Sequence, residues 1–468
     1  MTHSVDRTLP PLPGPAPLVR PGGHHAAVLP NGLRVVVVED HRIPVVSAQL
    51  RFNIPPVCQG DRAGQVDLVA DLLAAGTHRL TKAQIDERTD HLGAQLHAYS
   101  HGLFITALTR HFPRMLDLMG EAATGATFPE EELVKARTRL LANIEARADE
   151  PDAVADTVGH ALAFGKDHPY GEVATTASVS AIGRELPWAW YRHFHRPEQG
   201  CLVLVGDVTK EEGMDLARAV FGAWKGSGTV MDGDAQAPGL GTWKVAPAKA
   251  PVGGPRTALV DRPGSAQSVL RVLFPTDLLP NDPLAMAAQV LNTILGGAVF
   301  NARLMQNLRE DKGWTYGVHS SLEPDRWAGL FSAGCSVKNA VAHQALAEIV
   351  KEVRAIRAAP VAAEELELAK NYMAGSFARS LEAPRTLARF ALNAWLNDLP
   401  EDHYTTWLQR LAAVTQDDVW HAAQRFLHPD RAVLLVVGDA AQVHEGLAGV
   451  ASNGTVERFD PGGEPVGN

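Results

Sequence analysis

Two aspartates at helical spacing are the first residues of this sequence that could do chemistry. Asp67 and Asp71 lie in the segment from Gly64 to Thr77, whose apolar residues recur at the period of a helix. A spacing of four puts both carboxylates on one helix face, which is the geometry that two ligands of one metal ion need. The alternative is a pair of hydrated surface carboxylates, because two carboxylates with no third ligand make a weak metal site.

The histidines and cysteines give no metal site by spacing. Cys58, Cys201 and Cys335 are far apart and form no C-x-x-C pair, so we expect reduced core residues. His97 and His101 are four residues apart, but their segment reads as a strand, in which such residues are ~13 Å apart and cannot share one metal ion. The sequence therefore predicts no metal in this chain.

Composition limits the classes of function. The chain has 468 residues, 46% hydrophobic and 21% charged, so we expect a folded protein of two to four domains. Its net charge of −10, the lack of a basic block and the lack of a phosphate-binding glycine fingerprint argue against nucleic-acid and nucleotide binding. No apolar run reaches the ~18 residues that span a membrane, and no secretion signal is visible. We therefore expect a cytoplasmic protein, or a periplasmic one if a signal peptide has been removed.

The chain reads as two halves that share one order of elements. The expected parts are a proline-rich disordered arm (1–25), a first domain (26–228), a Gly, Ala and Pro-rich linker (229–255), a second domain (256–449) and a flexible tail (450–468). Each half has β-branched strands first, amphipathic helices later and an apolar strand at its end. The pattern predicts an α+β fold used twice.

A repeated motif indicates that the halves arose by duplication. Each half ends with a tryptophan, a phenylalanine and a proline, followed by an apolar strand that ends in Gly-Asp. The matching residues are Trp188, Phe194, Pro197 and 202–207 in the first half, and Trp420, Phe426, Pro429 and 434–439 in the second. The alternative is chance, since helix–turn–strand units look alike in many proteins.

These features together resemble the insulinase-type (inverzincin) zinc peptidases, which include the mitochondrial processing peptidases and bacterial two-subunit enzymes. The resemblance runs from about residue 27 to 445. It implies two homologous α/β-sandwich halves of the LuxS/processing-peptidase-like metallohydrolase fold.

The first half departs from the family at its zinc motif. In the family a helix carries H-x-x-E-H, with two zinc-binding imidazoles and a glutamate base, and a later glutamate completes the site. The aligned residues here are Asp67, Ala70 and Asp71, and the later glutamate falls on or beside Asn143. Ala70 cannot deprotonate a water molecule. A self-sufficient hydrolase that uses Asp67 and Asp71 stays a third interpretation, which stoichiometric metal in the isolated chain would support.

The second half retains a glycine-containing turn and an Arg–Tyr pair that resemble those of the family. The segment 295–304 resembles a glycine-containing turn that leads into a helix, and the resemblance assigns Gly296 and Gly297 to peptide binding. Arg309 and Tyr316 match an Arg and a Tyr seven residues apart, which in two-subunit members lie on the subunit without zinc. The resemblance implies that Arg309 orients a substrate carbonyl and that Tyr316 hydrogen-bonds the oxyanion. Without the resemblance, Arg309 reads as a helix cap and Tyr316 as a half-buried strand residue.

An expected edge strand at 95–101 is a third candidate site. Members of the family bind extended peptides along such an edge through main-chain hydrogen bonds, which assigns His97 and Tyr99 to peptide contact. The sequence does not decide between an open edge and a covered one.

The resulting hypothesis is a non-catalytic subunit of a heterodimeric zinc-dependent endopeptidase. It pairs with a zinc-bearing homologue, holds no cofactor itself, and lends Arg309 and Tyr316 to the partner, which cleaves unfolded peptides. The main alternative is a catalytically inert peptide-binding or structural protein of the same family, like the peptidase-derived core subunits of respiratory complexes.

Overall fold

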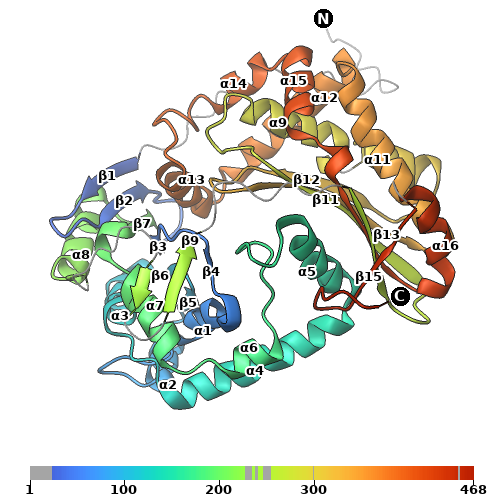
Figure 1. Cartoon of the computed structure of the whole chain (residues 1–468). Helices are drawn as coiled ribbons and strands as arrows, with labels where there is room; N and C mark the ends of the chain where they lie inside the picture. Colours follow the sequence, from blue (N-terminus) through green and yellow to red (C-terminus); the bar gives the residue numbers. More distant parts are fainter. Residues whose placement is uncertain are drawn as a thin grey trace, which may run out of the picture.

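Two six-stranded sheets, each with its own helices, form the framework of the protein (Figure 1). The structure is a computed structural model. It describes residues 24–226, 235–237, 241–245, 255–298, 300–451 and 454–467. The proline-rich arm expected at 1–25 lies almost entirely outside the described residues.

The first sheet has the strand order β1-β2-β7-β3-β6-β5. Its strands are β1 (His24–Val28), β2 (Arg34–Glu39), β3 (Val45–Phe52), β5 (Gln95–Tyr99), β6 (Gly102–Leu108) and β7 (Gly200–Gly206). Residues of β3 alternate between buried and partly exposed, as expected for a strand with one face on the core. Every residue of β7 is buried, because β7 is central and helices cover it on both faces.

Helices of the first half pack on one face of this sheet. Their apolar residues join those of β2, β3, β6 and β7 in one core. These helices are α1 (Gln65–Leu72), α2 (Lys82–His91), α3 (Phe112–Gly125), α7 (Glu185–Phe194) and α8 (Lys210–Phe221), and the short α6 (Thr176–Ser180) lies beside α4 (Glu130–Asp149).

The second sheet repeats the first. Its order is β15-β10-β14-β11-β13-β12, from β10 (Arg256–Asp261), β11 (Gln267–Thr276), β12 (Val318–Glu323), β13 (Gly329–Lys338), β14 (Val433–Gly438) and β15 (Glu457–Phe459). The register repeats too: Val203 pairs with Gln49, and Leu435, which is 232 residues further on, pairs with Arg271. The remaining helices are α9 (Ala285–Asn292), α10 (Arg303–Met305), α11 (Ala342–Ala358), α12 (Ala363–Ser380), α13 (Pro384–Leu396), α14 (Trp407–Ala413), α15 (Gln416–Phe426) and α16 (Ala440–Val450).

The outer edge strands break the repeat and correct one expectation. β1 precedes β2 and pairs with it antiparallel, whereas β15 comes from the end of the chain and pairs with β10 in parallel. The prediction of a flexible tail at 450–468 is therefore wrong for the part of the tail that the structure describes. Phe459 is buried against the second sheet, and Glu457 forms an ion pair of 2.6 Å with Arg256. Both contacts join residues about 200 positions apart, so local periodicity does not reveal them.

The linker expected at 229–255 lies mostly outside the described residues. Its described part holds two short strands, β8 (Ala235–Ala237) and β9 (Gly241–Val245), which pair with each other. β9 also pairs with β4 (Val57–Cys58) of the first half, and the three strands form a small separate sheet.

The two halves exchange helices. The 20-residue helix α4 leads into α5 (Pro151–Phe164), and α5 packs on the second sheet (Figure 1). In return, α13 of the second half packs on β2 and β7 of the first sheet, with Ala388 and Leu392 buried there. Arg262 strengthens the first contact by donating hydrogen bonds to the last carbonyls of α4, at Ala148 and Asp149. One face of each sheet is therefore covered by a helix from the other half of the chain. Among the described helices, none is both long and apolar enough to cross a membrane.

Candidate functional site

Helix α1 places Asp67 and Asp71 on its exposed face. Leu68, Val69 and Leu72 are fully buried and fix the opposite face in the core. The helix starts at Gly64, whose φ of 102° favours glycine and where a Cβ would lie 2.7 Å from Val179. The predicted geometry is therefore present: two carboxylates lie one turn apart on one helix face.

Basic side chains of α4 interact with the two aspartates on that face. Arg139 donates to the Asp71 carboxylate at 3.2 Å. The pKa of Asp67 is raised, first by desolvation and then by the charge of Asp71, while the charge of Arg147 on α4 opposes the shift. Arg139, Asn143 and Arg147 follow one another at a spacing of four, so they share the α4 face that looks toward α1. The degenerate zinc motif thus takes part in an ion pair between α1 and α4.

These residues do not fit a catalytic zinc ion. Such a site needs three nitrogen, sulfur or carboxylate ligands and a base, but Ala70 and Asn143 supply neither. Asp71 is already paired with a guanidinium group. In the described part of the chain, no three His, Cys, Asp or Glu side chains gather closely enough to hold a metal ion.

Arg309 and Tyr316 form a stacked pair on the second half. Arg309 lies in a π-helical segment, Gln306–Asp311, a geometry that is frequent at functional sites. Its guanidinium carbon lies 5.3 Å from the centre of the Tyr316 ring and 5.1 Å from that of Phe300. Tyr316 is 92% exposed just before β12, so it is not a half-buried strand residue. The guanidinium contacts two exposed rings, and the Tyr316 side chain is open to solvent.

Gly296 and Gly297 lie in a second π-helical turn, Thr293–Gly297, which crosses the edge strand β12. A Cβ on Gly296 would lie 2.7 Å from the backbone nitrogen of Ser320, and one on Gly297 would lie 2.8 Å from Asn292 Nδ2. Glycine at position 296 is therefore required for close packing of the turn against β12, and glycine at position 297 for its packing against the end of α9. Peptide binding by these two residues stays a prediction.

His97 and Tyr99 lie on β5, the edge strand of the first sheet. They point to the same face, where His97 is in register with Phe104 and stacks on it, while Tyr99 is in register with Gly102 and stacks on His101. Both side chains are exposed. Their role in peptide contact stays a prediction.

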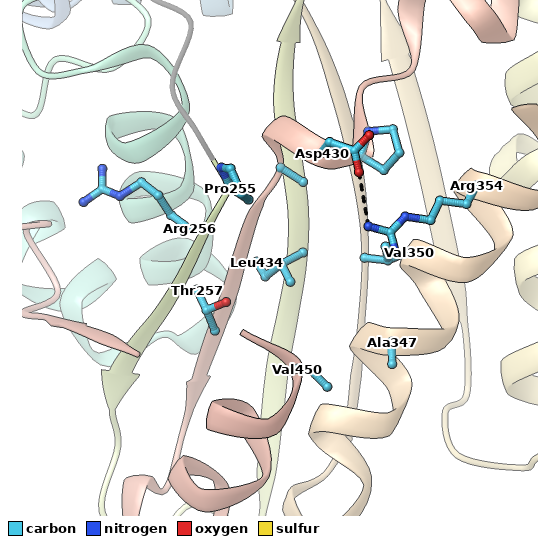
Figure 2. Close-up of a pocket in the computed structure, with 11 residues that line it drawn as sticks. Pro255, Arg256, Thr257, Ala347, Val350, Arg354, Asp430, Leu434 and Val450 are labelled. Carbon is cyan, nitrogen blue, oxygen red and sulfur yellow. Dashed lines mark hydrogen bonds and ion pairs between the residues drawn. The ribbon is translucent and has the colours of Figure 1, made fainter. Parts of the chain in front are cut away.

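Two cavities lie in the second half. One of about 360 Å³ opens between the turn that carries Phe300 and helix α12, with Leu368 and Tyr372 on its rim. The other, of about 280 Å³, lies beside the start of β10, and Figure 2 shows the Arg354–Asp430 ion pair at its wall. Among the described residues that line these two cavities, none is a predicted site residue.

Sequence reasoning missed two residues that shape these sites. Phe300 lies within the glycine-containing segment but had no assigned role, although an aromatic residue close to an arginine signals stacking. Arg139 lies one helical turn before Asn143, and that spacing from a motif position could have identified it. The structure gathers Asp71 with Arg139, and Arg309 with Phe300 and Tyr316.

Comparison with known proteins agrees with this geometry. Residues 183–373 match the family model described as the peptidase M16 inactive domain. An uncharacterized zinc protease of Streptomyces coelicolor is 26% identical over 438 residues, which cover 90% of this chain and 92% of that protein. An uncharacterized zinc protease of Mycobacterium tuberculosis is 27% identical over 344 residues, covering 68% and 75%.

Solved structures show the same fold. The peptidase M16 inactive domain from Pseudomonas fluorescens superposes with a TM-score of 0.78 at 22% identity, covering 89% of this chain and 98% of that one. A protease from Helicobacter pylori gives a TM-score of 0.76 at 18% identity, covering 89% and 99%. The family match over residues 183–373, the duplicated fold and the motif without zinc ligands agree with one another: the chain is similar to the insulinase-type (M16) peptidases, and part of it matches their inactive domain.

Proposed function

We propose that this chain is the non-catalytic subunit of a heterodimeric zinc endopeptidase and completes the active site of a zinc-bearing homologue. The observation that carries the proposal is the Arg309–Tyr316 pair. A tyrosine that is 92% exposed contributes little to its own fold, so its hydroxyl is available to a second molecule. The contacts of Arg309 with the Phe300 and Tyr316 rings restrict its guanidinium before any substrate arrives.

The two residues have separate roles in this proposal. Arg309 presents forked N–H donors to a carbonyl oxygen of the peptide backbone. The Tyr316 hydroxyl donates a hydrogen bond to the oxygen that becomes negatively charged when the scissile carbonyl is attacked. Metal binding and water activation belong to the partner, because Asp67, Ala70 and Asp71 supply neither three ligands nor a base.

The test is reconstitution with a zinc-bearing homologue from the same cells. The purified pair should cleave an unfolded reporter peptide in a chelator-sensitive way, while each subunit alone should not. Tyr316→Phe should lower the cleavage rate ~10²-fold or more, the usual effect of removing one oxyanion donor, and should leave co-purification intact. Tyr372→Phe is a matched control, because Tyr372 is exposed on α12 and outside the pair.

One observation favours the alternative of an inert binding or structural protein. The ion pair between Asp71 and Arg139 stabilises the degenerate motif without a metal, as in a protein that has abandoned catalysis. On this alternative, a complex with a homologue still forms, but cleavage does not respond to Arg309→Ala or Tyr316→Phe.

A further inference from the structure

Two arginines flank the central strand on the inner face of the first sheet. Arg34 of β2 and Arg51 of β3 are both in register with Cys201 of the central strand β7, one on each side of it. Residues in register on neighbouring strands point to the same face. Cys201 packs against α13 of the second half, so this face looks toward the second half. The two Cα atoms are about two strand spacings, or ~10 Å, apart, which long side chains can bridge.

Neither arginine has an acidic partner. Within the described residues, the side chains of Arg34 and Arg51 make no ion pair or hydrogen bond, and the Nε atom of each is buried without a partner. Burial lowers the pKa of Arg51 to about 10, and the charge of Arg34 acts on the buried thiol of Cys201. The Arg51 guanidinium therefore remains positively charged at neutral pH, and both arginines are only partly exposed.

Three other half-buried arginines of this chain are neutralised by carboxylates. Arg256 pairs with Glu457, Arg303 pairs with Glu365, and Arg271 pairs with both Asp152 and Asp156 at 2.8 and 3.0 Å. The chain carries ten more acidic than basic residues, so counter-charges are abundant. A partly buried cation without a counter-charge is costly, and a ligand that supplies a negative charge removes that cost.

The residues in register with Arg51 on the next two strands are compatible with a bound peptide. On the far side of Arg51 the row continues through Gly102 of β6 to Tyr99 of β5. Gly102 has no side chain, so no side chain separates Arg51 from Tyr99 along this line of paired residues. A backbone can cross the sheet there, next to an aromatic ring and two forked cations, which bind carboxylates in a bidentate manner.

We propose that Arg34 and Arg51 form a binding site for a carboxylate group of a peptide that lies on the inner face of the first sheet. The carboxylate comes from the C-terminus of the peptide or from an aspartate or glutamate side chain. The site belongs to this chain alone. The proposal deepens the peptide-binding part of the proposed function but does not need the partner, so the two can fail separately.

The test measures binding of fluorescent eight-residue Gly-Ser-Thr peptides to the purified chain by anisotropy. Four probes separate the two sources of charge: a free C-terminal acid, its C-terminal amide, an amide with one internal Glu, and the same amide with Gln. We expect the free acid or the Glu amide to bind at least about tenfold more tightly than its uncharged counterpart. The preference should weaken as salt rises, because the contact is ionic.

Variants locate the site. Arg34→Gln and Arg51→Gln should each abolish the preference for the charged probe, while Arg51→Lys, which keeps the charge, should retain part of it. Arg114→Gln is the matched control, because Arg114 lies on α3, which covers the opposite face of the same sheet, and its loss changes net charge equally. Equal affinity for charged and uncharged probes would overturn the proposal. An equal loss of the preference in Arg114→Gln would do so as well, and circular dichroism checks that each variant is folded.

Discussion

Gly159 offers a direct test of how the two halves are joined. It lies in α5, on the face that packs on the second sheet. A Cβ at this position would lie 3.0 Å from Leu273 Cδ1 and 3.7 Å from Leu435 Cδ2, both in the other half of the chain. A leucine side chain adds three more carbons in that direction. Gly159→Leu therefore forces α5 away from β11 and β14 or displaces Leu273.

The magnitude follows from two opposing effects. Replacing a helical glycine by leucine stabilises a helix by roughly 0.5–1 kcal/mol. Overpacking a tight interface costs about 1–3 kcal/mol. Gly375→Leu is the matched control, because Gly375 is also helical, in α12, but a Cβ there meets no atom within 4 Å. The two variants should therefore differ by about 1–3 kcal/mol in the free energy of unfolding, with Gly375→Leu the more stable.

A second substitution across the interface sharpens the assay. Leu273→Ala alone should destabilise by roughly 2–5 kcal/mol, because Leu273 is buried. In the double variant with Gly159→Leu the cost should be smaller than the sum by more than about 1 kcal/mol, since the new side chain fills the space that Leu273 leaves. Urea unfolding followed by circular dichroism measures these energies. Additive costs, or equal midpoints for Gly159→Leu and Gly375→Leu, would refute the exchange of α5 between the halves.

Three further predictions concern other parts of the fold. His195 is fully enclosed and stacks on Phe52, and burial lowers its pKa to about 4. Its imidazole therefore stays neutral in the folded state at pH 5, whereas in the unfolded state it takes up a proton below pH ~6.5. Stability should therefore fall by about 2 kcal/mol from this residue between pH 7 and 5, and His195→Phe should remove that part of the pH dependence; an unchanged difference between the two pH values in urea unfolding would contradict this. Phe459→Ala should destabilise by roughly 3 kcal/mol, because its ring is buried on the second sheet and lies 5.5 Å from the Arg256 guanidinium; a loss below ~0.5 kcal/mol in the same assay would show that β15 is not docked. Arg139→Ala should cost less than about 1 kcal/mol, since both members of its ion pair are largely exposed, and the variant should still bind no stoichiometric zinc when metal content is measured by mass spectrometry.

Much of the fold could be predicted from the sequence because its signals are local. The alternation in β3 and the helical periodicity of α1 and α4 each depend on neighbouring residues, and the observed elements agree with them. The offset of 232 between the halves needs only comparison of the chain with itself, and the strand pairing repeats with an offset of 232 from β7 to β14 and of 222 from β3 to β11. The departure from the zinc motif is likewise a matter of residue identity at Asp67, Ala70 and Asp71.

The partners of those residues were decided by the tertiary structure. Asp71 meets Arg139 from a helix 68 residues away, and the uncompensated pair of Arg34 and Arg51 exists only because β7 inserts between their strands. Such contacts depend on which distant segments meet, and no periodicity within one segment encodes that.

The sequence by itself determined that this protein is a duplicated α+β chain with a degenerate metal motif and an Arg–Tyr pair. Only the tertiary structure decided that α5 and α13 are exchanged between the halves, that β15 joins the second sheet, and that Arg309 contacts the rings of Phe300 and Tyr316. The physical reason is that helices and strands form from nearby residues, whereas a buried face can be covered by any apolar surface that the chain brings to it.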